Sequence, residues 1–309
     1  MADPSRRVGR ELLLATMFGP RPPFDAEAVM ARVLEEAEEL EVAAGDVLMR
    51  EGDPSDHLVI MIDGRVRLTR PGLVDWVYRG RWAIGATDAI LRRPRRRTVV
   101  VEVGSRMLRF PAARYLDVME ESQELVALTL PAVARAIEGL LDRLGPAAAP
   151  PATGDAAAPA PLLTLAARVE LLGRVPLLAG GPVQGLAELA AASTVEEHAA
   201  GTEVITPGRP DPRLLVIARG CVALERAAGT LRFGPGTAVG AAVWSVARDA
   251  VHRAVAVEPT TIVAVPLDAW LDRFEEHPSL GTAAIAALSA ERERLQERLA
   301  ERLGELVLD

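Results

Sequence analysis

The sequence has very little cysteine, few aromatic residues and no long apolar run. One of its 309 residues is cysteine, Cys221, and only 4% are aromatic. A lone thiol excludes a disulfide within the chain and favours a reducing compartment, so we predict a cytoplasmic location. A membrane span needs about 18 consecutive apolar residues, and the sequence lacks such a stretch, so we expect none. The first twenty residues faintly resemble a twin-arginine export signal, but Glu11 interrupts their apolar part and indicates an amphipathic helix instead.

Basic residues are also in the minority, since 35 lysines and arginines face 43 acidic residues and the formal net charge is −8. An acidic chain is not attracted to nucleic acid as a whole, so DNA binding would require a segregated basic patch. The four histidines are scattered without metal-ligand spacing, which predicts no metal site. A nucleophile elbow, a Walker loop and a zinc-protease motif are all missing, so we predict no catalytic residues and no enzyme.

Alanine, proline and glycine fill residues 145–161, a composition that cannot bury a core and is typical of an extended linker. This linker predicts one domain over residues 1–144 and a second over residues 162–309. The two halves share a series of landmarks at nearly constant spacing, which indicates an internal duplication. The paired landmarks are Gly45, Gly52, Gly64, Gly80, Gly85, Pro111 and Tyr115 in the first copy, and Gly201, Gly208, Gly220, Gly236, Gly240, Pro266 and Trp270 in the second.

Each copy is rich in short apolar segments separated by Gly, Pro and Asp turns, which predicts many short strands. Segments of helical periodicity flank the strands, at residues 25–40 and 122–145 around the first copy. Pro131 should kink or divide the second of these helices. The predicted fold class is therefore mainly β with flanking α-helices, arranged as two tandem jelly-roll barrels joined by the Ala/Pro-rich linker.

The last predicted helix, over residues 279–306, carries an apolar stripe among alternating glutamates and arginines. Two interpretations stay open. The helix either packs on the barrel that precedes it or forms a short coiled-coil contact in a homodimer. The residues of the stripe that would form a protein interface are Leu295, Leu299, Leu303 and Leu306.

The segment "AAGDVLMREGDPSDHLVIMIDGRVRL", followed by Gly80, Gly85, "RPRRRTVVVEV" and "LRFPAARYLDVM", resembles the cyclic-nucleotide-binding domain superfamily. That superfamily includes the sensor half of the catabolite activator protein and the regulatory subunits of protein kinase A. The resemblance implies a jelly-roll barrel with a phosphate-binding cassette of the pattern Phe-Gly-Glu-Leu-Ala-Leu-Leu, three variable residues, then Pro-Arg-Ser/Thr-Ala. In such a cassette the Glu accepts from the ribose 2′-hydroxyl, while the Arg and backbone N–H groups hold the cyclic phosphate.

The first copy departs from this pattern at several cassette positions. Ala86 stands where the family has Glu, which should weaken a buried ribose contact by about 1–3 kcal/mol. Asp88 would substitute only if the loop were two residues shorter. Larger side chains, Arg96 and Arg97, replace the hydroxyl residue and the small alanine. The candidate anion or cyclic-nucleotide cassette of the first copy consists of Gly85, Ala86, Asp88, Arg95 and Arg96.

The second copy retains Gly240 but has Ala241 in place of the Glu, and Asp249 and Ala250 in place of Pro-Arg. An aspartate repels phosphate, so we expect no cyclic nucleotide there. A degenerate pocket of this kind is typical of a domain kept for protein contacts.

The run "LRRPRRRT" at residues 91–98 leaves three interpretations open: a solvated loop, an anion or acidic-partner site centred on Arg95, and a nucleic-acid contact. The first functional hypothesis is a non-enzymatic regulatory or scaffold protein that binds another, unidentified protein. The alternative is a sensor that binds a cyclic nucleotide, or another phosphorylated ligand, in the first domain alone, so no cofactor is certain. A DNA-binding regulator is disfavoured, because little more than one helix follows Pro266 where a helix-turn-helix would need more.

Overall fold

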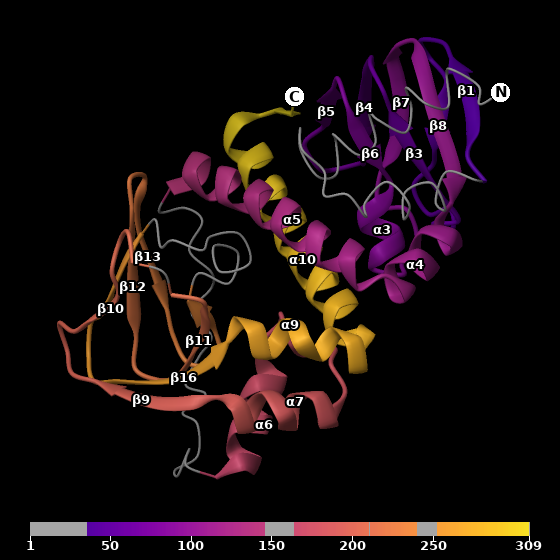
Figure 1. Cartoon of the computed structure of the whole chain (residues 1–309). Helices are drawn as coiled ribbons and strands as arrows, with labels where there is room; N and C mark the ends of the chain where they lie inside the picture. Colours follow the sequence, from indigo (N-terminus) through magenta and orange to yellow (C-terminus); the bar gives the residue numbers. More distant parts are fainter. Residues whose placement is uncertain (1–35, 146–163, 210, 240–251, 309) are drawn as a thin grey trace. The chain divides into compact units, whose positions relative to one another are not determined.

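The computed structural model describes residues 36–145, 164–209, 211–239 and 252–308 (Figure 1). Its contacts divide the chain into two compact units. The first consists of Met1–Ala132 together with Ser289–Asp309, and the second of Val133–Leu288. The predicted linker and the two cassette substitutions Asp249 and Ala250 lie outside the described residues, as do Gly240, Ala241, and most of the helix predicted over residues 25–40.

The first unit contains two sheets whose strands are antiparallel except for one pair, and the chain crosses repeatedly from one sheet to the other. One has the strand order β1-β8-β3-β6, and the other has the order β17-β5-β4-β7-β2, in which β17 pairs with β5 in parallel. The strands are β1 (Glu38–Val42), β2 (Val47–Met49), β3 (His57–Met61), β4 (Arg65–Thr69), β5 (Trp76–Arg79), β6 (Trp82–Ile84), β7 (Thr98–Val103), β8 (Ser105–Pro111) and β17 (Leu306–Leu308). Residues 38–40, which the apolar periodicity assigned to a helix, belong to β1 because they pair with β8.

The second unit repeats this topology with the sheets β9-β16-β11-β14 and β10-β15-β12-β13. Apolar side chains of both sheets, among them Ile217, Leu224 and Ile262, form one core cluster, so the two sheets pack face to face. The strands are β9 (Thr194–His198), β10 (Glu203–Ile205), β11 (Arg213–Arg219), β12 (Val222–Arg226), β13 (Gly229–Phe233), β14 (Ala238–Val239), β15 (Arg253–Ala256) and β16 (Thr260–Pro266).

The structure confirms the internal duplication at the level of strand order and backbone conformation. Each strand of the second unit has a counterpart at the same place in the first, and among the described strands only β17 lacks one. The paired glycines Gly64 and Gly220 both adopt positive φ, at 107° and 80°. A Cβ atom at either position would meet atoms of the neighbouring strand at 2.8 Å or less, so both turns require glycine. The prediction of a mainly β jelly-roll fold is thereby confirmed, but among the described strands the sheets remain open and form no closed barrel.

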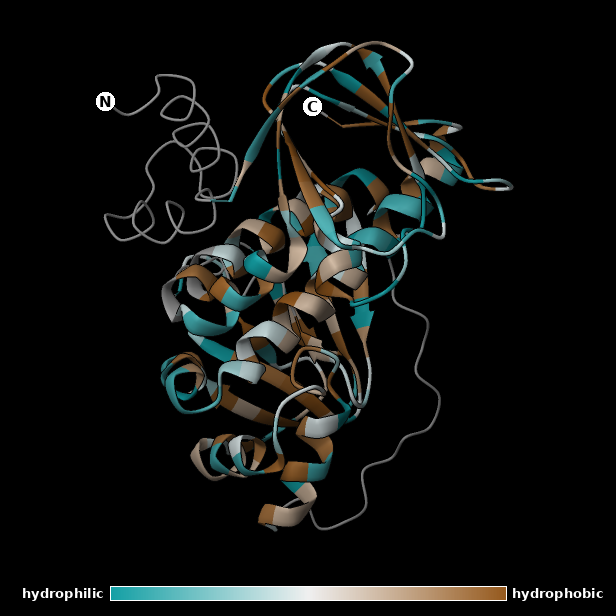
Figure 2. Cartoon of the chain, turned by 90° about the vertical axis from the view of Figure 1, so that its right-hand side faces the viewer, coloured by the Kyte–Doolittle hydropathy of each residue, from teal (hydrophilic) through white to brown (hydrophobic). Residues whose placement is uncertain are grey.

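Helices flank the sheets of both units. They are α3 (Ala86–Ile90), α4 (Ala112–Glu121), α5 (Gln123–Leu144), α6 (Leu165–Arg174), α7 (Val183–Ala192), α9 (Leu267–Glu276) and α10 (Pro278–Leu303). The prediction that Pro131 divides a helix is wrong, since α5 continues through it and the break lies at Ser122 instead. Helices such as α4 bury an apolar face, and Figure 2 shows hydrophobic and hydrophilic residues interspersed along the chain. None of the described helices combines the length and apolar character needed to cross a bilayer.

Two of these helices are shared between the units. The first part of α10 belongs to the second unit. Its last fifteen residues belong to the first unit, and they are Ser289–Leu303. Likewise, α5 begins in the first unit and its residues from Val133 onward belong to the second. The boundaries of the compact units therefore differ from the linear domains 1–144 and 162–309, whose limits stay a prediction.

The apolar stripe at the end of the chain lies within the first unit. Leu295, Leu299 and Leu306 are fully buried, whereas Leu303 is 53% exposed. Leu306 is not helical but lies in β17. Three of the four leucines are therefore buried within their own chain. They belong to the unit of the first copy, not to that of the second copy, which precedes the helix in sequence. A homodimer contact through these leucines stays a prediction.

Candidate functional site

The cassette of the first copy starts at Gly85, which closes β6 and caps the short helix α3. Gly85 has φ 85°, a left-handed conformation that side chains disfavour. A Cβ atom here would lie 2.5 Å from Nη1 of Arg95 and 2.8 Å from Cε of Met49. The cassette is thus packed tightly around this glycine, and Met49 fills the space beside it.

Arg95 occupies the cassette position at which the family resemblance places the phosphate-binding arginine. The residue is only 2% exposed. Its Nη1 donates to the carbonyl of Gly85 at 3.0 Å, and its Nη2 donates to the carbonyl of His57. Its backbone is fixed as well, because Arg95 N donates to Asp53 O at 2.9 Å and Gly52 N donates to Arg95 O at 2.9 Å. Burial lowers the pKa of Arg95, yet a guanidinium stays charged in proteins. The charge is therefore held by carbonyl dipoles of its own chain.

Asp88 faces the arginine run from the third residue of α3. Its Oδ1 accepts from Nε of Arg93 at 2.8 Å, and its Oδ2 accepts from the backbone N–H of Arg96 at 3.3 Å. Both carboxylate oxygens are thus engaged with the end of the cassette. The idea that Asp88 replaces the missing ribose acceptor at Ala86 finds no support in this geometry.

The other arginines of the run also have partners within the first unit. Nη2 of Arg93 donates to both carboxylate oxygens of Glu293, at 2.5 and 2.7 Å. Arg96 contacts Glu293 and Glu297, each at 3.1 Å. Burial lowers the pKa of Arg93, but its hydrogen bonds to Glu293 and Asp88 outweigh burial and raise that pKa overall. Arg93 and Arg96 thus form ion pairs within the chain.

Arg97 and Arg92 complete the run. The guanidinium of Arg97 lies 4.0 Å from the ring centroid of Trp76, a cation–π contact, and donates to the carbonyl of Val74 at 2.8 Å. Burial lowers its pKa. Arg92 pairs with Glu120 at 2.7 Å on the exposed surface. The aromatic partner of Arg97 comes from β5, which sequence reasoning did not connect with the cassette.

The structure brings together every predicted cassette residue, and it adds residues that the sequence did not single out. The additions from the cassette itself and from the strands are Met49, His57 and Thr87. The additions from α10 are Arg292, Glu293 and Glu297, and Nη2 of Arg292 donates to the hydroxyl of Thr87 at 2.8 Å. The spacing of the internal repeat could have singled out Glu293 and Glu297. Glu293 and Glu297 follow Glu138 and Asp142 by 155 residues, the offset that separates Pro266 from Pro111.

The second unit has a cation cluster of its own, formed by Arg226 and His252. Arg226, on β12, has a side chain that is 2% exposed and pairs with Glu138 at 2.5 Å and with Asp142 at 2.7 Å. His252 lies 3.7 Å from the same Glu138 oxygen. Burial, followed by the charge of Arg226, lowers the pKa of His252. Here too, a helix supplies two carboxylates to cations of the unit.

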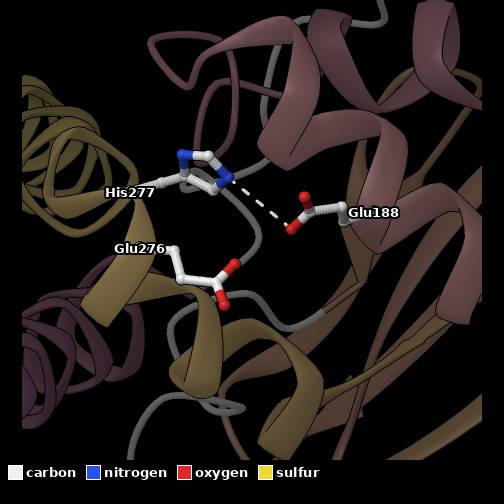
Figure 3. A group of neighbouring side chains, drawn as sticks. All are labelled: Glu188, Glu276 and His277. Carbon is white, nitrogen blue, oxygen red and sulfur yellow. Dashed lines mark ion pairs between the residues drawn. The ribbon is translucent and has the colours of Figure 1, made fainter.

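A separate cluster in the second unit joins Glu188 of α7 to Glu276 and His277 at the end of α9 (Figure 3). The ligand atoms lie within 4.8 Å of one another. However, Nε of Arg273 lies 2.9 Å from the Glu188 oxygen that faces Nε2 of His277 at 3.6 Å. The arginine neutralises the carboxylate that a cation would need, so the cluster serves to tie α7 to α9.

The model of the cyclic nucleotide-binding domain matches residues 39–122, which span the first copy from β1 to the end of α4. These residues are similar to a cyclic nucleotide-binding domain. The second copy, which lies outside the match, repeats the strand order of the first. No curated protein matches the sequence.

Several solved structures are similar to the chain. A regulatory subunit of a cAMP-independent protein kinase A from Trypanosoma brucei is 17% identical, covers 89% of this chain and 90% of its own, and has a TM-score of 0.36. The regulatory domain of Toxoplasma gondii protein kinase A, crystallised with cAMP, is 13% identical over 97% and 98% of the two chains, with a TM-score of 0.33. The sensor domain of the transcriptional regulator DNR from Pseudomonas aeruginosa is 23% identical, covers 45% of this chain and 93% of its own, and has a TM-score of 0.38.

Proposed function

We propose that the chain is a non-enzymatic regulatory protein whose cyclic nucleotide-binding domains serve protein–protein interaction rather than nucleotide sensing. The observation that carries this proposal is the internal use of Arg95, whose two terminal nitrogens donate to the carbonyls of Gly85 and His57. A cyclic phosphate would have to displace these bonds and the packing around them. A cytoplasmic location and an unidentified protein partner belong to the same proposal.

The missing ribose acceptor supports the proposal independently. Ala86 cannot accept a hydrogen bond through its side chain, and both oxygens of Asp88 are engaged with Arg93 and Arg96. A nucleotide would therefore bury its ribose hydroxyl without a carboxylate partner, at a cost of about 1–3 kcal/mol. Together with the occupied arginine, this disfavours a nucleotide at physiological concentrations.

Titration calorimetry with cyclic AMP, cyclic GMP and cyclic dinucleotides tests the proposal. We expect the wild-type chain and an Arg95→Ala variant to give the same negligible heats at micromolar concentrations. Micromolar binding by the wild type that Arg95→Ala abolishes would overturn the proposal and favour a sensor.

The sensor remains the second candidate because one observation favours it. Gly85, Pro94 and Arg95 keep the family spacing, and the buried Nε of Arg95 has no hydrogen-bond partner. An unpaired guanidinium N–H is a donor that a phosphate oxygen would satisfy. DNA binding stays disfavoured, and a filter-binding assay at physiological salt should retain no DNA.

A further inference from the structure

The acidic end of α10 binds the basic end of the cassette through charge-assisted hydrogen bonds. Arg93 donates to both oxygens of Glu293, while Arg96 reaches Glu293 and Glu297. Glu293 has a side chain only 10% exposed, although it lies 200 residues from Arg93 in the sequence. Charge-assisted hydrogen bonds are shorter and about twice as strong as neutral ones. The two carboxylates thus stand where an external acidic group would otherwise meet these arginines.

The segment that follows α10 forms a second, independent attachment to the first unit. Strand β17 adds to the edge of β5 in parallel, with Val307 opposite Val77, and Leu306 N donates to Asp75 O at 3.1 Å. Leu306 is fully buried, and Glu305 pairs with Arg67 at 2.9 Å. An uncovered edge strand invites pairing with other chains, so β17 also protects β5.

The internal repeat shows that this arrangement is systematic. The helix that follows the first copy carries Glu138 and Asp142 at the equivalent positions, and these hold Arg226 of the second unit. In both units, carboxylates four residues apart on one helix face meet buried or half-buried cations. If these two helix positions were merely solvated, we would not expect both copies to pair them with arginines.

We propose that residues Ser289–Leu308 form a C-terminal latch that closes the first domain in cis, with Glu293 and Glu297 as built-in anions for the arginines of its cassette. The surface made by Arg93, Arg96 and the edge of β5 is then a receptor for an acidic helix followed by a strand, and the chain fills it with its own. An acidic partner of the cassette would have to displace the latch. This inference goes beyond the proposed function, because it holds whether or not a nucleotide binds.

Disulfide trapping in the full chain tests where the occupant comes from. In a Cys221→Ser background, cysteines replace Val77 and Val307, which are register partners on adjacent strands. Neighbouring strands lie about 5 Å apart, within reach of a disulfide. We expect oxidation to cross-link the chain within itself. The control pair, Val103→Cys with Val307→Cys, places β4 and β5 between the two cysteines and should not cross-link. A cross-linked dimer, or no cross-link in the test pair, would overturn the latch in cis.

Hydrogen exchange tests the role of the carboxylates. Glu293→Gln with Glu297→Gln removes both anions but preserves size, so the amides of residues 306–308 should exchange about tenfold faster. Glu301→Gln, an exposed position on the same helix, is the matched control and should leave exchange unchanged. Should the double variant misfold, Glu297→Gln alone, at a side chain 26% exposed, should still raise exchange. Unchanged exchange in a folded variant would rule out the carboxylates as the holding element.

Discussion

Gly85 sets the geometry of the cassette from a single position. Its left-handed backbone turns the chain from β6 into α3, and its missing side chain leaves room for the guanidinium of Arg95 and for Met49. Gly80 has a similar φ of 72°, but nothing lies within 4 Å of the place where its Cβ would stand. A substitution at Gly80 therefore tests backbone strain alone, whereas one at Gly85 tests backbone strain together with steric crowding.

Gly85→Ala should destabilise the first unit more than Gly80→Ala. We expect Gly80→Ala to cost about 1–2 kcal/mol, for the left-handed backbone alone. Gly85→Ala should add about 1–3 kcal/mol for overpacking against Arg95 and Met49. Urea denaturation of both variants measures the difference. Equal losses of unfolding free energy would show that the cassette yields freely around Gly85.

The tyrosines make the first unit sensitive to alkaline pH. The chain has two, Tyr78 and Tyr115, and burial raises the pKa of each to about 12 from an ordinary value of 10. Between these values the unfolded chain has lost both phenolic protons while the folded chain keeps them. Stability therefore falls as pH rises from about 10 to 12, by roughly 1.4 kcal/mol per unit for each tyrosine.

Ultraviolet absorbance of tyrosinate measures this titration directly, because only two groups contribute. Near pH 10 we expect almost no tyrosinate signal from the folded chain, and about half of the full signal in denaturant, where the pKa returns to its ordinary value. Substantial ionisation of the folded chain at that pH would contradict the burial of both rings.

At the scale of elements, α5 and α10 connect distant parts of the chain. Each follows one copy in sequence and ends in the unit built around the other. Each also brings a pair of carboxylates to cations of that unit, Arg226 for α5 and Arg93 with Arg96 for α10. The end of each helix is therefore specified by charge as well as by apolar packing.

Arg226→Ala should destabilise the second unit by about 3 kcal/mol, because it leaves Glu138 without its buried partner. Arg232→Ala on the neighbouring strand β13 is the control, and at an exposed position it should cost no more than about 0.5 kcal/mol. Denaturant unfolding monitored by hydrogen exchange in residues 133–144 compares the two. Similar small losses in both variants would show that the buried pair contributes little to the attachment of α5.

At the scale of the whole molecule, the exchange of helices links the stability of the two units. The second unit is one continuous stretch, Val133–Leu288, whereas the first combines Met1–Ala132 with Ser289–Asp309, and each unit contains the end of a helix that begins in the other. Two boundaries between the units therefore fall inside continuous helices, and we expect this continuity to couple their unfolding.

Calorimetric unfolding should accordingly give a single transition, with equal calorimetric and van't Hoff enthalpies. The carboxamide variant Glu293→Gln with Glu297→Gln loosens one link and should broaden or split that transition. Two well-separated transitions in the wild type would show that the units unfold independently despite the shared helices.

The sequence by itself determined the repeat, the β character of both copies and the position of the cassette. These features depend on local rules: glycines where φ is positive, apolar segments with strand lengths, and a Pro-Arg pair at a set distance from Gly85. The prediction failed where strand pairing competed with helical periodicity, as at residues 38–40, and where a proline was tolerated inside α5.

Only the tertiary structure decided what the arginines of residues 92–97 do. Local pattern showed five positive charges in an acidic chain, but their partners Glu293 and Glu297 lie some 200 residues away and Trp76 lies on another strand. Periodicity assigns a residue to a face of its own element, and it carries no information on which distant element covers that face. The pairing of charges across the fold therefore appeared only once the chain was folded.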